Sequence, residues 1–119
     1  MPRYVDGFVI AIPKRNLAAY KKIAQVASKV WMEHGALAYR ECVGEDLDQP
    51  MGIPFPKLVA AKRGETVVFA WIEYRSRAHR DKVNKKVMQD ERMLAYCNKK
   101  MPFEIARMSF GGFEVLVQA

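Results

Sequence analysis

The sequence predicts an α+β fold with the element order βαββαβ and a four-stranded antiparallel sheet. Three observations carry this prediction. Strand and helix patterns alternate in that order, the strand pattern at residues 66–74 is strong, and both faces of that strand are apolar. The length of 119 residues fits a single domain over residues 1–119.

The chain begins with a strand and a helix. Residues 4–12 alternate in apolar side chains, and Pro13 ends the strand because proline lacks the N–H that a sheet ladder needs. Residues 17–34 repeat apolar side chains at spacings of three and four, which is typical of an amphipathic helix. We expect Asn16 to cap the start of this helix and Gly35 to end it.

A second strand is predicted at residues 36–43, and a long connection follows at residues 44–65. The connection holds three prolines and three glycines, with a short apolar turn at residues 57–61. Connections of this length in compact domains are often functional or mobile. A plain connector around the sheet edge and a lid over a site fit this composition equally well.

Residues 66–74, with the sequence TVVFAWIEY, form the third strand. Their β-branched and aromatic side chains favour a pleated surface. Successive side chains alternate between the faces, so Val68 and Ile72 share one face while Phe69 and Trp71 share the other. Both faces are therefore largely apolar, and both need covering.

The last part of the chain predicts a helix and a final strand region. Ser76 is a suitable cap for a helix at residues 77–89. Strand-like segments at residues 104–108 and 113–117 flank the glycine pair 111–112. Paired glycines in a strand region indicate a bulge or a close approach of another group to the backbone.

These elements make two β-α-β halves, which together define the ferredoxin-like arrangement with both helices on one face of the sheet. The other face would leave several large apolar side chains in water. Burying each of them is worth about 1.5–3 kcal/mol, and monomers rarely tolerate so large an apolar patch. We therefore expect a homodimer through the sheet faces. Because both faces of the strand at residues 66–74 are apolar, the sequence does not decide which of them meets the partner protomer.

Composition and charge limit the expected cellular location and partners of the protein. The chain contains no apolar run long enough for a transmembrane helix, and its start does not resemble a signal peptide. Cys42 and Cys97 make no disulfide framework, so we expect a cytoplasmic location. The net charge of +7 permits an anionic partner, but a well-solvated surface is the simpler explanation.

Candidate catalytic residues are few. Asp6 and Glu41 interrupt apolar strand alternation, and with His79 they are weak candidates for an acid or base in a pocket between sheet and helices. For Asp6 and Glu41 the structural alternative is contact with solvent or with a nearby arginine. For His34 and His79 it is a packed or helix-end position. No metal-ligand spacing and no phosphate-binding loop is present, so we predict neither a metal nor a cofactor. The candidate pocket-lining residues are Trp31, His34, Tyr39, Trp71 and Tyr74.

The predicted helix at residues 77–89 and the residues before it are rich in bases. They could bind a polyanion non-specifically, but no aromatic interleaving accompanies them, and nucleic acid is an unexpected partner. A solvated helix face is the simpler interpretation. The candidate anion-binding residues are Arg75, Arg77, Arg80, Lys82, Lys85 and Lys86.

Several segments resemble the YbaA-like family of bacterial proteins of unknown function. They read VDGFVIAIPK, VWMEHGALAYRECV, ETVVFAWIEYRSRAHRDKVNKKVM, MPF and GGFEVLV, and they span nearly the whole chain. The resemblance implies a protomer of the dimeric α/β-barrel group, whose other members include cofactor-free monooxygenases, small isomerases, dehalogenating enzymes and haem-binding proteins. The fold does not transfer function among them, and the family has no catalytic residues to carry over.

The expected function is therefore broad. By analogy of fold, any enzymatic activity would at most resemble that of a cofactor-free monooxygenase or an isomerase. We expect a homodimer that binds or converts a small molecule in a pocket between sheet and helices. The alternative is a non-catalytic dimer, either regulatory or binding RNA or DNA through the basic residues 75–86.

Overall fold

A computed structural model describes residues 2–119. Its sheet is antiparallel with four strands in the order β2-β3-β1-β4, which confirms the predicted ferredoxin-like fold. The strands are β1 (Tyr4–Pro13), β2 (Ala38–Val43), β3 (Glu65–Tyr74) and β4 (Ser109–Glu114). The helices are α1 (Leu17–Glu33), α2 (Phe55–Leu58), α3 (Arg77–Gln89) and α4 (Glu91–Leu94), with 3-10 turns η1 (Lys14–Asn16) and η2 (Ile105–Arg107).

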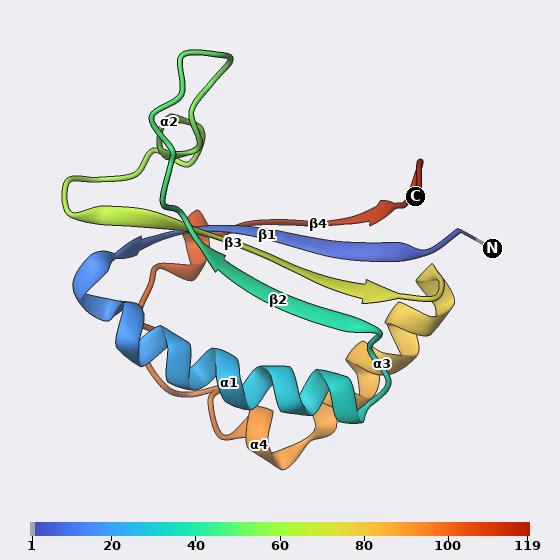
Figure 1. Ribbon diagram of the computed structural model, residues 1–119. Coiled ribbons are helices and arrows are strands. Elements are labelled where there is room, and N and C mark those ends of the chain that lie inside the picture. The colour runs from blue at the N-terminus through green and yellow to red at the C-terminus, as the bar shows by residue number, and fades with distance from the viewer. Residues whose placement is uncertain (1) are drawn as a thin grey trace.

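Register and burial along the central strands show which face of the sheet meets the helices. Tyr4 pairs with Tyr74 at one end of β1 and β3, and Pro13 pairs with Glu65 at the other. The β3 side chains at even positions from 66 to 74 are all buried, whereas Phe69 on the opposite face is 42% exposed. The helix layer, α1 with α3 and α4, lies on the even-numbered side only (Figure 1). The opposite side, which we call the open face, stays apolar and uncovered over much of its area.

The core forms where α1 and α3 pack on the sheet. From α1 come the small side chains Ala24 and Ala27 together with Val30, and all three are buried. From α3 come Val83 and Val87, which form its thin apolar stripe. At the start of α3, Ser76 accepts a hydrogen bond from the backbone of His79 at 3.1 Å, so the predicted cap is confirmed.

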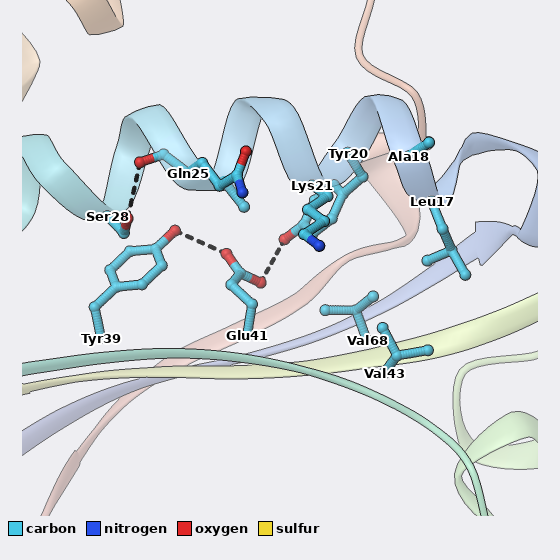
Figure 2. Close-up of a pocket in the computed structure, with 11 residues that line it drawn as sticks. Leu17, Ala18, Tyr20, Lys21, Gln25, Ser28, Tyr39, Glu41, Val43 and Val68 are labelled. Carbon is cyan, nitrogen blue, oxygen red and sulfur yellow. Dashed lines mark hydrogen bonds between the residues drawn. The ribbon is translucent and has the colours of Figure 1, made fainter.

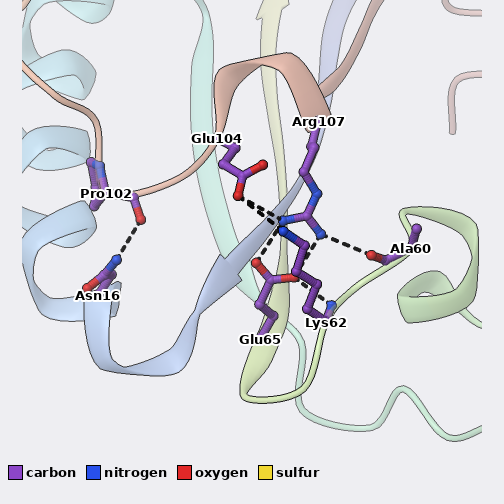
Figure 3. Close-up of polar contacts among 7 residues, drawn as sticks. All are labelled: Asn16, Ala60, Lys62, Glu65, Pro102, Glu104 and Arg107. Atoms are coloured by element: carbon purple, nitrogen blue, oxygen red, sulfur yellow. Dashed lines mark hydrogen bonds and ion pairs between the residues drawn. The ribbon is translucent and has the colours of Figure 1, made fainter.

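The start of α1 differs from the sequence prediction. Asn16 occupies the capping position, but its side chain makes no capping hydrogen bond. Its amide instead donates to the carbonyl of Pro102 at 2.9 Å (Figure 3), since the segment before β4 passes beside this corner. The turn η1 precedes the helix, and the contact with Pro102 ties the start of α1 to the segment between α4 and η2. The stop at Gly35 is as predicted, because its φ of +112° suits glycine.

The final strand also lies elsewhere than predicted. Residues 105–107 form the turn η2, and the glycine pair lies inside β4 rather than between two strands. Gly112 stands opposite Asp6 on β1, and a Cβ there would overlap the hydroxyl and ring of Tyr4. Gly112 is therefore needed for a close approach, which is one of the two alternatives that the glycine pair predicted, whereas a Cβ at Gly111 would make only ordinary contacts.

The connection at residues 44–64 rises from the open face and carries α2 (Figure 1). Its Phe55 packs edge-on against Phe69, with ring centroids 6.1 Å apart. At its base, the guanidinium of Arg107 donates to the carbonyl of Ala60 and to both carboxylate oxygens of Glu65 (Figure 3). These contacts place the connection on the side of the sheet away from the helices. Its role as a lid stays a prediction.

None of the helices in the described part of the chain is both long and apolar enough to cross a membrane.

Candidate functional site

Two adjoining cavities lie between α1 and the sheet. The outer cavity, of about 540 Å³, is an open groove between α1 and the edge strand β2. The inner cavity, of about 190 Å³, lies deeper among α1, the central strands and the segment from α4 to β4. Their walls share four residues, namely Tyr20, Ala24, Tyr39 and Glu41. Both cavities therefore meet at the same small group of polar side chains.

That group is a carboxylate held between two phenols (Figure 2). The hydroxyl of Tyr20 on α1 donates to one Glu41 oxygen at 2.7 Å, and the hydroxyl of Tyr39 on β2 donates to the other at 2.7 Å. Tyr39 and Glu41 are two residues apart on β2, so both side chains point toward the helices. Helix α1 supplies Tyr20 from across the gap. We call these three residues the Tyr-Glu-Tyr bridge.

The environment keeps both phenols protonated. Burial raises the pKa of Tyr20, and the Glu41 charge adds to the effect. The pKa of Tyr39 is raised by the same two causes, first by burial and then by the charge of Glu41. Both hydroxyls therefore remain hydrogen-bond donors at neutral pH, and both donate to the carboxylate. An ionised carboxyl has about four acceptor positions, so Glu41 can accept a further donor from a molecule in either cavity.

The remaining wall of the inner cavity is apolar. Aromatic rings and thioethers dominate it, and Tyr20 packs edge-on against Phe103 with ring centroids 5.7 Å apart. The indole N–H of Trp31 lines the cavity but is used elsewhere, because it donates to Tyr74 and Asn84 at 3.1 Å each. A carboxylate among such neighbours is the feature that sets this cavity apart from ordinary core packing.

Asp6 lies outside both cavities in a second polar group. It is 1% exposed and faces Arg80 of α3, with 3.3 Å between its Oδ1 and the Arg80 Nη1. Within residues 2–119 that oxygen has no partner in hydrogen-bond geometry. Burial raises the pKa of Asp6, and Arg80 opposes the rise. The guanidinium of Arg80 also lies over the Tyr4 ring, 4.9 Å from its centroid. The arrangement is that of a buried ion pair in the core.

Neither histidine faces the cavities. The Nδ1 of His79 accepts a hydrogen bond from the backbone of Arg75 at 3.0 Å, and burial followed by the charge of Arg75 lowers its pKa. His34 ends α1 and contacts Asp90 at 2.9 Å. Both therefore stand at helix ends, in the structural positions that sequence reasoning named as their alternative. No three His, Cys, Asp or Glu side chains within residues 2–119 come together as ligands for a metal ion.

The structure separates the predicted pocket-lining residues. Trp31 and Tyr39 line the inner cavity with Glu41, whereas Tyr74 is fully buried in the core beside it. Trp71 points to the open face, where a shallow hollow of about 530 Å³ also includes Phe69. One face of β3 therefore borders the inner cavity and the core, and the other forms part of the open face.

Sequence reasoning missed part of the wall. Tyr20 belongs to the apolar pattern of the first helix and looks like a core residue in the sequence. Its hydroxyl becomes a donor to Glu41 only because β2 lies across from α1 in the folded protein. The wall residues that come from after α3 had no signal, because that segment has no regular periodicity. They are Met93, Met101, Phe103 and Met108.

The structure divides the predicted anion-binding residues. Arg80 turns into the core toward Asp6, while Arg75, which precedes α3, and the other four, which lie on α3, are exposed. Polyanion binding by this helix stays a prediction.

Fold and cavity together define an α+β protein of the ferredoxin-like type with a hollow between its helix layer and its sheet. Residues 3–105 match the family described as "Protein of unknown function (DUF1428)". The chain is 42% identical to the uncharacterised protein YbaA of Escherichia coli strain K12, over 97% of each chain. The chain therefore belongs to this family of unknown function.

Solved structures of similar fold are more distant in sequence. One is a dimeric ferredoxin-like protein from an uncultured marine organism, with a TM-score of 0.60 and 13% identity over 100% of both chains. Another is an antibiotic biosynthesis monooxygenase-like protein from Nitrosomonas europaea, with a TM-score of 0.59 and 12% identity over 96% of this chain and 90% of that one. At these identities the likeness shows the fold alone.

Proposed function

We propose that this protein is a homodimer that binds a small, largely apolar molecule in the cavities between α1 and the sheet. The observation that carries the proposal is the Tyr-Glu-Tyr bridge. A carboxylate inside an apolar wall is costly unless its hydrogen bonds are satisfied, and two tyrosines are committed to satisfying it. Ligand sites combine such a polar group with an apolar cavity of a few hundred Å³.

The homodimer rests on the open face. Val5, Val9 and Trp71 form an apolar surface there, and Phe113 on the same face is 62% exposed. Two such faces packed together would remove these side chains from water. A solved structure of the same fold is described as dimeric, which supports a dimer but does not say through which face. The cavities lie on the other side of the sheet, so dimerisation leaves them free.

Filling the cavity tests ligand binding. Ala24 is buried and lines both cavities, so Ala24→Leu places three additional carbon atoms where the ligand would lie. We expect the wild-type protein to bind members of a panel of one- and two-ring apolar molecules in ligand-observed NMR. Ala24→Leu should weaken that binding at least tenfold, because the substitution occupies the space itself.

Ala19→Leu is the matched control. Ala19 is exposed on the same helix and lines neither cavity, so this variant should bind like the wild type. Absence of binding by the wild-type protein across the whole panel would contradict the proposal. Equal binding by Ala24→Leu and Ala19→Leu would place any ligand elsewhere.

A further inference from the structure

The inner cavity admits only a narrow class of molecule, and its size sets the first limit. Its volume of about 190 Å³ is slightly larger than an apolar cavity of roughly 150 Å³ that accepts benzene in a protein core. A single ring with one or two small substituents fits this space. Two fused rings would have to reach past the Tyr-Glu-Tyr bridge into the outer cavity.

The chemistry of the wall sets the second limit. Phe8, Trp31 and Phe103 offer ring faces and edges, and the three methionines that line the cavity offer thioethers. Aromatic rings prefer edge-to-face partners, and thioether sulfur makes favourable contacts with rings at about 5 Å. A flat unsaturated ring therefore matches this wall better than a saturated chain of equal volume.

The hydrogen-bond inventory sets the third limit. The polar groups of the wall are the two phenols, Glu41 and the indole N–H of Trp31. Both phenol hydrogens are donated to Glu41, and the indole hydrogen is shared between Tyr74 and Asn84. Every donor is thus in use, while the carboxylate retains acceptor positions. A ligand can gain a hydrogen bond here only by donating one, and an anionic ligand group would be repelled by Glu41.

We propose that the ligand is a neutral single-ring molecule with a hydroxyl donor, such as a phenol or a cyclic enol, its ring in the inner cavity and its hydroxyl on Glu41. This inference rests on the ligand-binding function proposed above and names its ligand class. The hydroxyl would join the two tyrosines as a third donor to the same carboxylate. Bonds of this O–H to carboxylate type are short and strong, as the two existing bonds at 2.7 Å already are.

Three probes that differ in one substituent test the inference. 4-Methylphenol can donate a hydrogen bond, 4-methylanisole can only accept one, and toluene does neither. In NMR titrations at pH 7, we expect the wild-type protein to bind 4-methylphenol at least tenfold more tightly than either of the others. Glu41→Gln should lose most of this preference, because its amide replaces a charged acceptor by a neutral acceptor and a donor. Glu45→Gln, an exposed substitution outside both cavities, is the matched control.

A second variant keeps the test informative if Glu41→Gln disturbs folding. Tyr20→Phe removes one donor but retains the carboxylate, so it should keep or increase the preference for 4-methylphenol. Equal affinity of the wild-type protein for all three probes would overturn this inference and leave ligand binding standing. A preference that persists in folded Glu41→Gln, or that Tyr20→Phe abolishes, would also overturn it. Binding of none of the three probes, together with no binding in the wider panel, would overturn both proposals.

Discussion

Glu41 and Asp6 occupy similar positions in their strand sequences but have different surroundings in the folded protein. Both interrupt an apolar strand, and both point to the helix side of the sheet. Glu41 lies on the edge strand β2, where the gap beneath α1 leaves cavities on either side of it. Asp6 lies on the central strand β1, where α3 supplies Arg80 and closes the space. The neighbour across the layer therefore decides whether a strand carboxylate faces a cavity or an ion pair.

The Asp6–Arg80 pair leads to a prediction about stability. Arg80→Met should lower the free energy of unfolding by about 3 kcal/mol at neutral pH, because it leaves a buried carboxylate without its counter-charge. Adding Asp6→Asn to that variant should recover much of the loss, since no buried charge then remains. Urea unfolding at one fixed protein concentration measures both values.

Arg77→Met serves as the control for this measurement, because Arg77 is an exposed base on the same helix. A loss for Arg80→Met no larger than the loss for Arg77→Met would show that the ion pair does not stabilise the fold.

At the scale of elements, the turn η2 holds the base of the 44–64 connection to the start of β3. Arg107 reaches both carboxylate oxygens of Glu65 at 2.8 Å and the carbonyl of Ala60 at 2.9 Å. The hydrogen bonds from Arg107 lower the pKa of Glu65 from 4.5 to about 2. Arg107 thus joins η2 to the end of the connection and to the start of β3, which lie 42 to 47 residues earlier in the chain. Glu65 must be ionised for both of its oxygens to accept these hydrogen bonds.

This contact predicts a pH dependence of stability. Because the pKa of Glu65 is lower in the folded protein, its contribution is complete above pH 4.5 and is lost as the pH falls toward about 2. The wild-type protein should therefore lose about 1–2 kcal/mol more of its unfolding free energy across this window than Glu65→Gln, after allowance for screening. Denaturant unfolding at several pH values measures the difference. Glu45→Gln, whose side chain is exposed, should follow the wild-type curve, and a parallel curve for Glu65→Gln would refute the assignment.

At the scale of the whole molecule, the two faces of the sheet differ in what covers them. The helix layer covers the even-numbered face and lines the cavities, while the open face presents Trp71, Phe69 and Phe113. The 44–64 connection and the C-terminal segment rise on the side of the sheet away from the helices (Figure 1). A carboxylate placed in the middle of that face would lie in the proposed contact between protomers, where its desolvation would cost several kcal/mol.

Trp71→Glu should therefore convert the homodimer to a monomer. Sedimentation at micromolar concentration should give a mass twice that of the chain for the wild type and a mass equal to one chain for the variant. Met88→Glu is the control, because Met88 is an exposed apolar residue on α3 in the helix layer. A wild-type protein that sediments as a single chain, or a Trp71→Glu variant that stays a dimer, would contradict the proposed assembly.

The sequence by itself determined the order of elements, because local patterns of two and 3.6 residues, the cap at Ser76 and the glycine at position 35 act over short distances. It also offered Trp31, Tyr39 and Glu41 as candidates, because their residue types stand out in their own segments, and all three line the inner cavity. Only the tertiary structure decided which face of β3 meets the helices, since both faces are apolar and the choice depends on pairing with β1. The same holds for Tyr20 and the Met-rich segment after α3. These residues become part of a cavity wall only when helix and sheet pack, and packing brings together positions that no local pattern relates.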